Sequence, residues 1–280
     1  MFRSLSEEAE FARSVTHPLA QHMREVFFGR DMKALKARKK ADGTWITALD
    51  EENSEAIEEA YRQRGIPAAS EESGKELYGT PNIILSDPID DTKNLVERMR
   101  AKAPTSTATI ALSLVKQYAV MGVVEAPLLS TPVTYTGFEG RAYRYSTSKR
   151  QRLTVSNATR GIVLVSDTGR EDINTRLRDC GFQPLLVSGS VFKAMALVNP
   201  TILGLYDRDL AAHGKTPIVG FVSTGAWTHD YAASSAIVKA ARGIATATNG
   251  DPLPYHPDTR GCVMANTPAV HSLLVEVMTA

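Results

Sequence analysis

Four β-rich runs follow one another in the middle of the chain with only turns between them, and this succession constrains the fold strongly. The runs span Thr107 to Val115, Val120 to Glu125, Val133 to Thr136 and Ala142 to Tyr145. Strands joined by short turns pair antiparallel, whereas parallel strands need a long crossover, usually a helix. The middle of the chain therefore predicts an antiparallel sheet.

The N-terminal third has a different, largely helical pattern. Residues 6–28 carry apolar side chains at helical spacing, and Pro18 inside this pattern predicts a kink or a break. Residues 50–64 predict an acidic amphipathic helix, and residues 82–85 predict a short buried strand. The basic stretch at residues 33–40 is compatible with a solvated loop and equally with a position near an anionic substrate.

After Ser156 the pattern alternates between strands and helices. Strands are predicted at residues 162–166, 185–187, 202–206, 244–246 and 262–265, and helices near residues 170–180, 191–198, 229–242 and from Pro268 onward. Alternation of this kind is typical of an α/β unit. The change of pattern near residues 150–160 predicts two halves, residues 1–155 and residues 156–280.

Composition excludes several classes of protein. Lys and Arg number 32 against 31 Asp and Glu, so the basic excess of a protein that binds nucleic acid polymers through bulk charge is missing. The 43% hydrophobic content indicates a globular chain. Apolar runs are too short for a bilayer and the N-terminus lacks a signal pattern, so we expect a cytoplasmic protein without membrane contact. Cys180 and Cys262 are expected to be buried free thiols.

Three acidic clusters lie where a predicted strand or turn meets a helix. They are Ser70 to Gly74, Asp87 to Asn94, and Trp227 to Asp230. Each alone is explained as a helix cap or a turn. In the middle cluster, however, three carboxylates within five residues repel one another unless protons or a cation neutralise them. Carboxylate oxygens suit Mg²⁺, and the six scattered histidines do not form a zinc-like array.

The middle cluster, Asp87-Pro88-Ile89-Asp90-x-Thr92, resembles the Asp-Pro-Ile/Leu-Asp-Gly-Thr signature of the inositol monophosphatase superfamily, a group of Mg²⁺-dependent and often lithium-sensitive phosphomonoesterases. Further matches follow in the same order as in that group. They are Ile46-Thr47-x-x-Asp50, Ser70 to Gly74, Asp230-x-Ala232-Ala233, and Gly243 to Pro252. The resemblance covers about residues 7–275. It implies a layered α/β/α/β/α sandwich with a mostly antiparallel first sheet, a smaller second sheet, and metals at their junction.

The resemblance also implies roles for individual residues. The expected ligands of two or three Mg²⁺ ions are Glu71, Asp87, the carbonyl of Ile89, Asp90 and Asp230, and inhibition by Li⁺ is expected. Glu71, Thr92 and Asp50 are the expected catalytic residues, with Thr92 and Asp50 as a relay that deprotonates the attacking water. The expected substrate-binding residues are Asp90, Asp91, Thr92, Lys93, Ser190, Lys193 and Asp230.

The sequence departs from this family at three places. Asp91 replaces the usual glycine: its side chain turns away, adds a metal ligand, or weakens the site, and the first outcome is favoured. His229 replaces a tryptophan, which alters the packing or puts an imidazole at the rim of the site. The longer segment from Asp207 to Thr224 is expected to form a substrate lid.

Substrate identity is the least constrained inference. Ser188 to Ala194 resembles the Gly-Ser-x-x-Lys segment of bisphosphate nucleotidases, although Lys193 is equally compatible with a helix surface. Lys93 and Leu205 to Arg208 also resemble that branch. A 3'(2'),5'-bisphosphate nucleotide is therefore the first expectation, an inositol or sugar monophosphate is the alternative, and a catalytically weak protein that binds a phosphorylated ligand is the third. Homodimers are common among relatives, but no interface can be identified.

Overall fold

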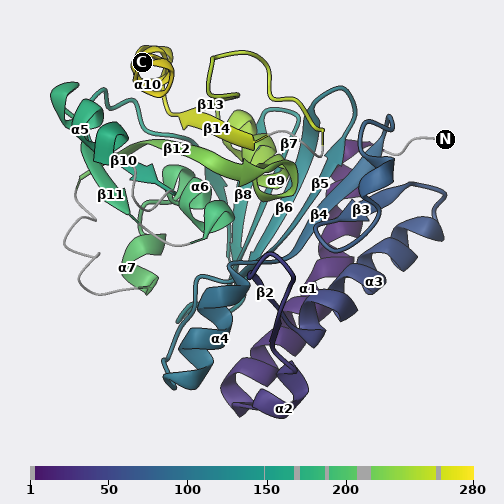
Figure 1. Cartoon of the computed structure of the whole chain (residues 1–280). Helices are drawn as coiled ribbons and strands as arrows, with labels where there is room; N and C mark the ends of the chain where they lie inside the picture. The colour runs from purple at the N-terminus through teal and green to yellow at the C-terminus, as the bar shows by residue number, and fades with distance from the viewer. Residues whose placement is uncertain (1–3, 148, 167–170, 187–188, 207–215, 257–259) are drawn as a thin grey trace.

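The computed structural model describes residues 4–147, 149–166, 171–186, 189–206, 216–256 and 260–280. Within these residues the chain forms five stacked layers, which Figure 1 shows. In order, they are helices α1 (Leu5–Gly29) and α3 (Ala48–Arg62), a seven-stranded sheet, helices α6 (Ser190–Val198) and α9 (Thr228–Ala240), a five-stranded sheet, and helices α5 (Glu171–Asp179) and α10 (Pro268–Thr279). The predicted α/β/α/β/α sandwich is confirmed.

The seven-stranded sheet has the strand order β3-β4-β5-β6-β7-β8-β9, so each strand pairs with its neighbour in sequence. The strands are β3 (Ala68–Ser70), β4 (Ile83–Asp90), β5 (Thr109–Val115), β6 (Ala119–Ala126), β7 (Val133–Phe138), β8 (Arg141–Ser146) and β9 (Lys149–Leu153). The β3–β4 pair is parallel and the others are antiparallel, as the succession of β-rich runs predicts. Strand β4 is longer than predicted and includes the acidic motif.

The five-stranded sheet has the order β11-β10-β12-β14-β13. Its strands are β10 (Ile162–Val165), β11 (Gln183–Leu186), β12 (Ile218–Trp227), β13 (Ile244–Thr246) and β14 (Arg260–Ala265). The strand predicted at residues 202–206 is wrong, because this segment is the short helix α7 (Ile202–Tyr206). An apolar run of five residues suits either element, and periodicity does not separate the two.

The lid predicted from Asp207 to Thr224 is also wrong in its second part. Residues 218–224 lie in β12, the central strand of the second sheet, and residues 218–223 are buried. Residues 207–215 lie outside the described part of the chain, and these include Asp207 and Arg208 of the nucleotidase-like strand end. Ser188, at the start of the other nucleotidase-like segment, also lies outside it. A run that contains Gly220 and follows Pro217 resembles a loop in sequence. In the structure, however, its backbone pairs with β10 on one side and with β14 on the other.

The N-terminal third is more regular than its sequence suggests. Helix α1 continues through Pro18, so the predicted break is wrong. The basic stretch forms helix α2 (Met32–Leu35) and strand β1 (Arg38–Lys39), which pairs with β2 (Trp45–Ile46) in a small hairpin. A 3₁₀ turn, η1 (Lys75–Leu77), and helix α4 (Thr92–Arg100) complete this part.

Two smaller findings concern the cysteines and membranes. Cys262 is buried as predicted, but Cys180 is exposed because it directly follows the last residue of α5. Among the described helices, none combines the length and apolar character that a bilayer crossing requires.

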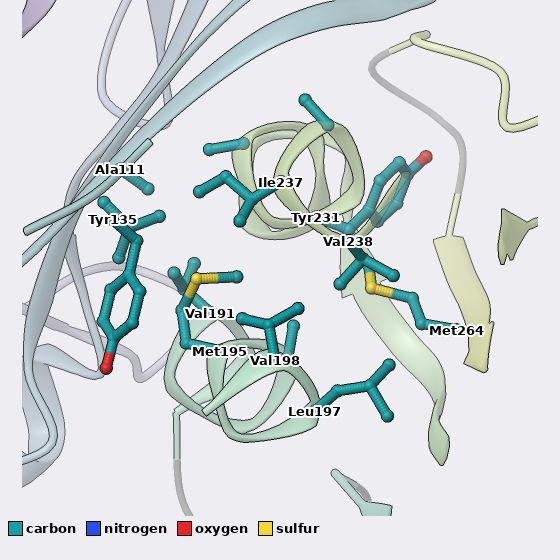
Figure 2. Packing of buried hydrophobic residues seen from close by; sticks show 14 of the residues in the cluster. Ala111, Tyr135, Val191, Met195, Leu197, Val198, Tyr231, Ile237, Val238 and Met264 are labelled. Carbon is teal, nitrogen blue, oxygen red and sulfur yellow. The ribbon is translucent and has the colours of Figure 1, made fainter. Parts of the chain in front are cut away.

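Helix α9 belongs to the second half of the sequence but packs directly on the sheet of the first half. A Cβ atom at Gly122 would lie 2.3 Å from the carbonyl oxygen of Ala233, and one at Gly137 would lie 2.5 Å from Cα of Ile237. The two glycines therefore allow α9 to approach the backbone of β6 and β7. Figure 2 shows Ile237 of α9 among the buried side chains that join α6, α9 and both sheets.

Candidate active site

A cleft of about 460 Å³ opens where the end of β4 meets the start of α4. Its lining includes Lys39 and Trp45 of the β1–β2 hairpin, and carboxylates that come from the segments around Glu71, Asp87–Asp91 and Asp230. Figure 1 shows helix α4 and the hairpin that contains β2 next to each other below the first sheet. Residues of the three acidic clusters and of the basic stretch therefore line the same cleft.

Asp87, Asp90 and Asp230 form the centre of this cleft. Their carboxylates offer oxygen atoms that all lie within 4.8 Å of one another. Asp87 and Asp90 are buried, the side chain of Asp230 is 16% exposed, and Oδ1 of Asp87 has no hydrogen-bond partner among the described residues. Three acids from two distant parts of the sequence are thus held closer than their charges favour.

The local backbone explains this placement. The pairing of β4 with β5 shifts register between Asp87 and Asp90, in the part of the strand that contains Pro88, a residue without a backbone N–H. Asp230 is the third residue of α9, and its Oδ2 accepts the backbone N–H of Trp227 at 2.6 Å. This capping bond fixes the side chain at the start of the helix.

The electrostatics of the cluster are unfavourable without a positive partner. Burial and the neighbouring carboxylates Glu71 and Asp90 hold the pKa of Asp87 well above its usual range. Burial and then the repulsion from Asp230 do the same for the pKa of Asp90. Burial raises the pKa of Asp230 to about 7. An all-oxygen set with an unpartnered buried oxygen fits a hard divalent cation such as Mg²⁺.

Glu71 lines the same cleft but is engaged by a lysine that sequence reasoning did not assign to the site. Nζ of Lys40, from the hairpin, lies 2.7 Å from Oε1 of Glu71 and 2.7 Å from Oε1 of Glu72. Although burial works against the charged form, the hydrogen bonds to both glutamates raise the pKa of Lys40. The basic stretch before the Asp42-Gly43 turn was the sequence feature that could have indicated this lysine. The structure places the end of that stretch next to the acidic cluster.

Asp50 and Thr92 lie in direct contact beside the cluster. The hydroxyl of Thr92 lies 2.8 Å from Oδ1 of Asp50 and 2.8 Å from the carbonyl oxygen of Ile89, and donates to one or the other. Thr47 donates its backbone N–H to Oδ2 of Asp50 at 2.8 Å, in a capping box at the start of α3. Burial raises the pKa of Asp50 to about 7.

Asp91 occupies the turn between β4 and α4. Its φ of 67° and ψ of 43° are left-handed, a conformation that aspartate and asparagine tolerate better than most residues with a side chain. The side chain makes no capping bond to α4; its Oδ2 accepts the hydroxyl of Thr107. The carboxylate is therefore turned away from the first amides of α4, although it still lines the cleft.

The other predicted substrate-binding residues differ in how far they are exposed to the cleft. Lys93 lines the rim, with a 70% exposed side chain whose Nζ lies 3.9 Å from Glu97. Lys193 is buried, so the helix-surface alternative for it is wrong, and its charge lowers the pKa of Asp90 and of Asp230. The backbone N–H of Ser190 donates to Oδ1 of Asp90 at 3.2 Å.

His229 does not lie exposed at the rim of the cleft. It is buried, with Nδ1 3.4 Å from the hydroxyl of Tyr78, and it borders a neighbouring cavity of about 410 Å³ that also reaches Glu71. Burial lowers the pKa of His229 to about 4, so the ring is neutral at physiological pH. Tyr78 and Thr107 are neighbours of site residues that no sequence pattern singled out, because their positions depend on long-range packing.

Two curated proteins are similar to this chain in sequence. Over 232 residues the chain is 29% identical to a 3'(2'),5'-bisphosphate nucleotidase CysQ of Salmonella typhimurium, covering 80% of this chain and 85% of the relative. The CysQ of Escherichia coli K12 is 27% identical over the same length and coverage.

Solved structures share the fold. An IMPase of Thermotoga maritima is 19% identical, with a TM-score of 0.70 over 98% of this chain and 97% of the other. A staphylococcal IMPase-I, solved with its products, is 14% identical, with a TM-score of 0.73 over 99% and 97%. The profile of the inositol monophosphatase family matches residues 4–279. The chain therefore belongs to the inositol monophosphatase family, a family of phosphoric monoester hydrolases.

Proposed function

We propose that this protein is a Mg²⁺-dependent phosphomonoesterase that hydrolyses a small phosphorylated metabolite. The observation that carries the proposal is the group of Asp87, Asp90 and Asp230, whose oxygens lie within 4.8 Å of one another next to the Thr92–Asp50 hydrogen bond. The three acids and the Thr92 hydroxyl thus line one cleft, with the carboxylate of Asp50 buried behind Thr92. The family assignment supports the same reaction class.

The residues suited to hold the cations are the carboxylates of Glu71, Asp87, Asp90 and Asp230, with the carbonyl of Ile89. When bound, two Mg²⁺ ions would lower the pKa of a water molecule, orient it, and stabilise the leaving oxygen. Glu71 joins this set once its carboxylate is released by Lys40, which pairs with it at 2.7 Å.

Thr92 and Asp50 are proposed to move the proton. In the proposed relay the hydroxyl of Thr92 donates to Asp50 rather than to the carbonyl of Ile89, and its oxygen lone pairs accept a hydrogen bond from the attacking water. As that water is deprotonated, its proton passes to Thr92 and the proton of Thr92 passes to Asp50. With a pKa of about 7, Asp50 is suited to accept a proton near neutral pH.

The phosphate is proposed to lie on the first amides of α4. The helix has nine residues, and the side chain of its N-cap residue, Asp91, accepts the hydroxyl of Thr107 and makes no capping bond. Backbone N–H groups at a helix N-terminus favour an anion through hydrogen bonds and the helix dipole. Lys93 at the rim adds a positive charge there.

Three functions fit a chain of this family. The curated relatives are named for bisphosphate nucleotides, which supports a substrate of that class. The IMPase neighbours share the fold, and an inositol or sugar monophosphate is the alternative substrate. A protein that binds a phosphorylated ligand with little turnover is the third, because Asp91 adds a negative charge beside the phosphate site.

The test is Mg²⁺-dependent phosphate release from a panel of phosphomonoesters by the purified protein. We expect turnover of at least one ester, and its loss on chelation. Asp90→Asn and Glu71→Gln should abolish turnover while circular dichroism remains native. Near-normal rates in either variant would refute the ligand assignment. Binding of an ester without any turnover would favour the ligand-binding protein instead.

A further inference from the structure

Three serine hydroxyls connect α3 to the turn that carries Glu71. The hydroxyl oxygen of Ser54, on α3, lies 2.7 Å from that of Ser70 and 3.2 Å from that of Ser73. The hydroxyl oxygens of Ser70 and Ser73 are 3.0 Å apart. Ser54 and Ser70 are buried, where a hydroxyl group without a hydrogen-bond partner is costly. The three serines therefore form one hydrogen-bonded network.

Glu58, one helical turn after Ser54, gives this network a direction. Its Oε1 accepts the hydroxyl of Ser54 at 2.9 Å and also the hydroxyl of Ser73. An ionised carboxylate only accepts hydrogen bonds, so both serines donate their single proton to it. Ser70 then donates to one of the two serine oxygens, and its own oxygen accepts the backbone N–H groups of Glu72 and Ser73, each at 3.1 Å.

The turn from Ser70 to Ser73 is held from two sides. The backbone N–H of Ser70 donates to the carbonyl of Ser73 at 2.9 Å, which closes the turn. The serine network attaches the turn to α3, and the backbone N–H of Glu71 donates to the carbonyl of Ser86 on β4 at 3.2 Å. Glu71 therefore reaches the cleft from a turn whose position depends on α3 as well as on β4.

The same face of α3 contacts the other parts of the site. Residues four positions apart lie on one face of a helix, and Asp50, Ser54 and Glu58 are spaced in this way. Asp50 contacts the hydroxyl of the proposed relay, and Nδ2 of Asn53 donates to the carbonyl of Pro88 at 3.1 Å, within the acidic motif of β4. One helix thus positions the relay, the β4 motif and the turn of Glu71 relative to one another.

We propose that Glu58 is a positioning residue that sets the affinity of the site for divalent cations, because it orients the serines that hold the turn of Glu71. The inference rests on the proposed function, in which Glu71 is a cation ligand. Glu58 acts through Ser54 and Ser73 and does not itself touch a cation. Without an acceptor at this position the two hydroxyls lose their shared partner, and the turn no longer holds the carboxylate of Glu71 in place for binding.

The experiment titrates Mn²⁺ into the native protein, Glu58→Leu and Glu58→Gln, with binding followed by electron paramagnetic resonance. Leucine has no acceptor, so the dissociation constant should rise by about tenfold, as for loss of a group that orients a metal ligand. Glutamine keeps an acceptor oxygen for both serines, so its dissociation constant should stay within about threefold of the native value. In turnover assays, Glu58→Leu should raise the Mg²⁺ concentration for half-maximal rate more than it lowers kcat at saturating Mg²⁺.

Glu55→Leu is the matched control. Glu55 is exposed on the same helix, and its replacement removes the same charge. Its Mn²⁺ affinity should remain native. Ser73→Ala is a second variant, which removes a hydroxyl that Glu58 accepts and should weaken Mn²⁺ binding even if Glu58→Leu does not fold. Native affinity in Ser73→Ala, an equal loss in Glu55→Leu, or a loss in Glu58→Gln as large as that in Glu58→Leu would each overturn the role of Glu58.

Cation binding separates this inference from the proposed function. If the native protein binds Mn²⁺ and hydrolyses no ester, the proposed hydrolysis is refuted, and the affinities of the variants still decide the role of Glu58. If the native protein hydrolyses an ester and all variants bind Mn²⁺ equally, only the role of Glu58 is overturned. A native protein that binds no Mn²⁺ would overturn both.

Discussion

Two sites in the seven-stranded sheet bury carboxyl groups, and their charges are compensated in different ways. Near the end of β4, Asp87 offers a carboxylate oxygen within 4.8 Å of one from Asp230, and its Oδ1 has no hydrogen-bond partner among the described residues. On β6, Glu125 lies under α1 and is 3% exposed. Thr16 and Thr134 donate their hydroxyls to its two oxygens, at 3.2 and 2.7 Å.

Cavity size does not distinguish the two sites, because each borders a cavity of about 460 Å³. Burial is the largest cause of the raised pKa at both Glu125 and Asp87. The next causes differ: the Thr134 hydroxyl, the positive charge of His17 and the Thr16 hydroxyl lower the pKa of Glu125, whereas Glu71 and Asp90 raise that of Asp87 further. A single buried acid can be satisfied by hydroxyl donors and nearby basic groups, but a cluster of acids is neutralised only by protons or a cation.

The largest predicted effect follows from removing an acid of the cluster. Asp87→Asn and Asp230→Asn should each lower phosphate release by at least about 100-fold, because cation ligands stabilise the transition state by several kcal/mol. Both should also lose the rise in Tm that Mg²⁺ gives the native protein. Glu125→Gln should keep that rise. Equal Mg²⁺ responses in all four proteins would remove the distinction between the two sites.

Thr92→Val separates proton transfer from cation binding. The hydroxyl that contacts Asp50 is lost while the shape is kept, so kcat should fall by roughly 100-fold, as for loss of a positioned proton-transfer group. Calorimetry should give Mg²⁺ affinity within about twofold of the native value. A comparable loss of Mg²⁺ affinity would place Thr92 in the cation site rather than in the relay.

Lys40→Gln tests whether an internal cation already compensates part of the cluster. Lys40 pairs with Glu71 and Glu72, so its removal should tighten binding of Mn²⁺, followed by electron paramagnetic resonance, by about tenfold. Lys39→Gln is the control, because Nζ of Lys39 lies over the ring of Trp45, 5.5 Å from its centroid. Equal effects of the two substitutions would indicate a general loss of positive charge.

The smallest effect is expected at Glu125. Its folded-state pKa lies above the ordinary value of 4.5, so the folded protein binds more protons than the unfolded chain and loses stability as pH rises above about that value. Glu125→Gln should therefore be more stable than the native protein at pH 8, by about 1 kcal/mol, and similar to it at pH 4. Urea unfolding at both values tests this. An advantage at pH 4 alone would contradict the sign.

The features that sequence reasoning recovered depend on local patterns. The successive strands, the acidic motif from Asp87 to Thr92, and the contact of Thr92 with Asp50 all follow from short segments or from the family resemblance. Helix α7 was missed because a short apolar run suits either element until its partners are known. Strand β12 was missed because Pro217 and Gly220 suggested a loop, whereas its burial between two strands depends on long-range pairing. The burial of His229 and the ion pairs of Lys40 arise from contacts between distant segments, which no local pattern encodes.

The close approach of α9 to the first sheet has a consequence for mutational tolerance. Asp230 is rigidly attached to a helix whose position is set by Gly122 and Gly137, because a methyl group at either would displace α9. Such a displacement would move one acid of the cluster relative to the other two, which lie on β4. Two glycines outside the cleft should thus be as intolerant of substitution as the acids themselves. A survey of inactivating substitutions would therefore find positions in the buried core as well as in the cleft.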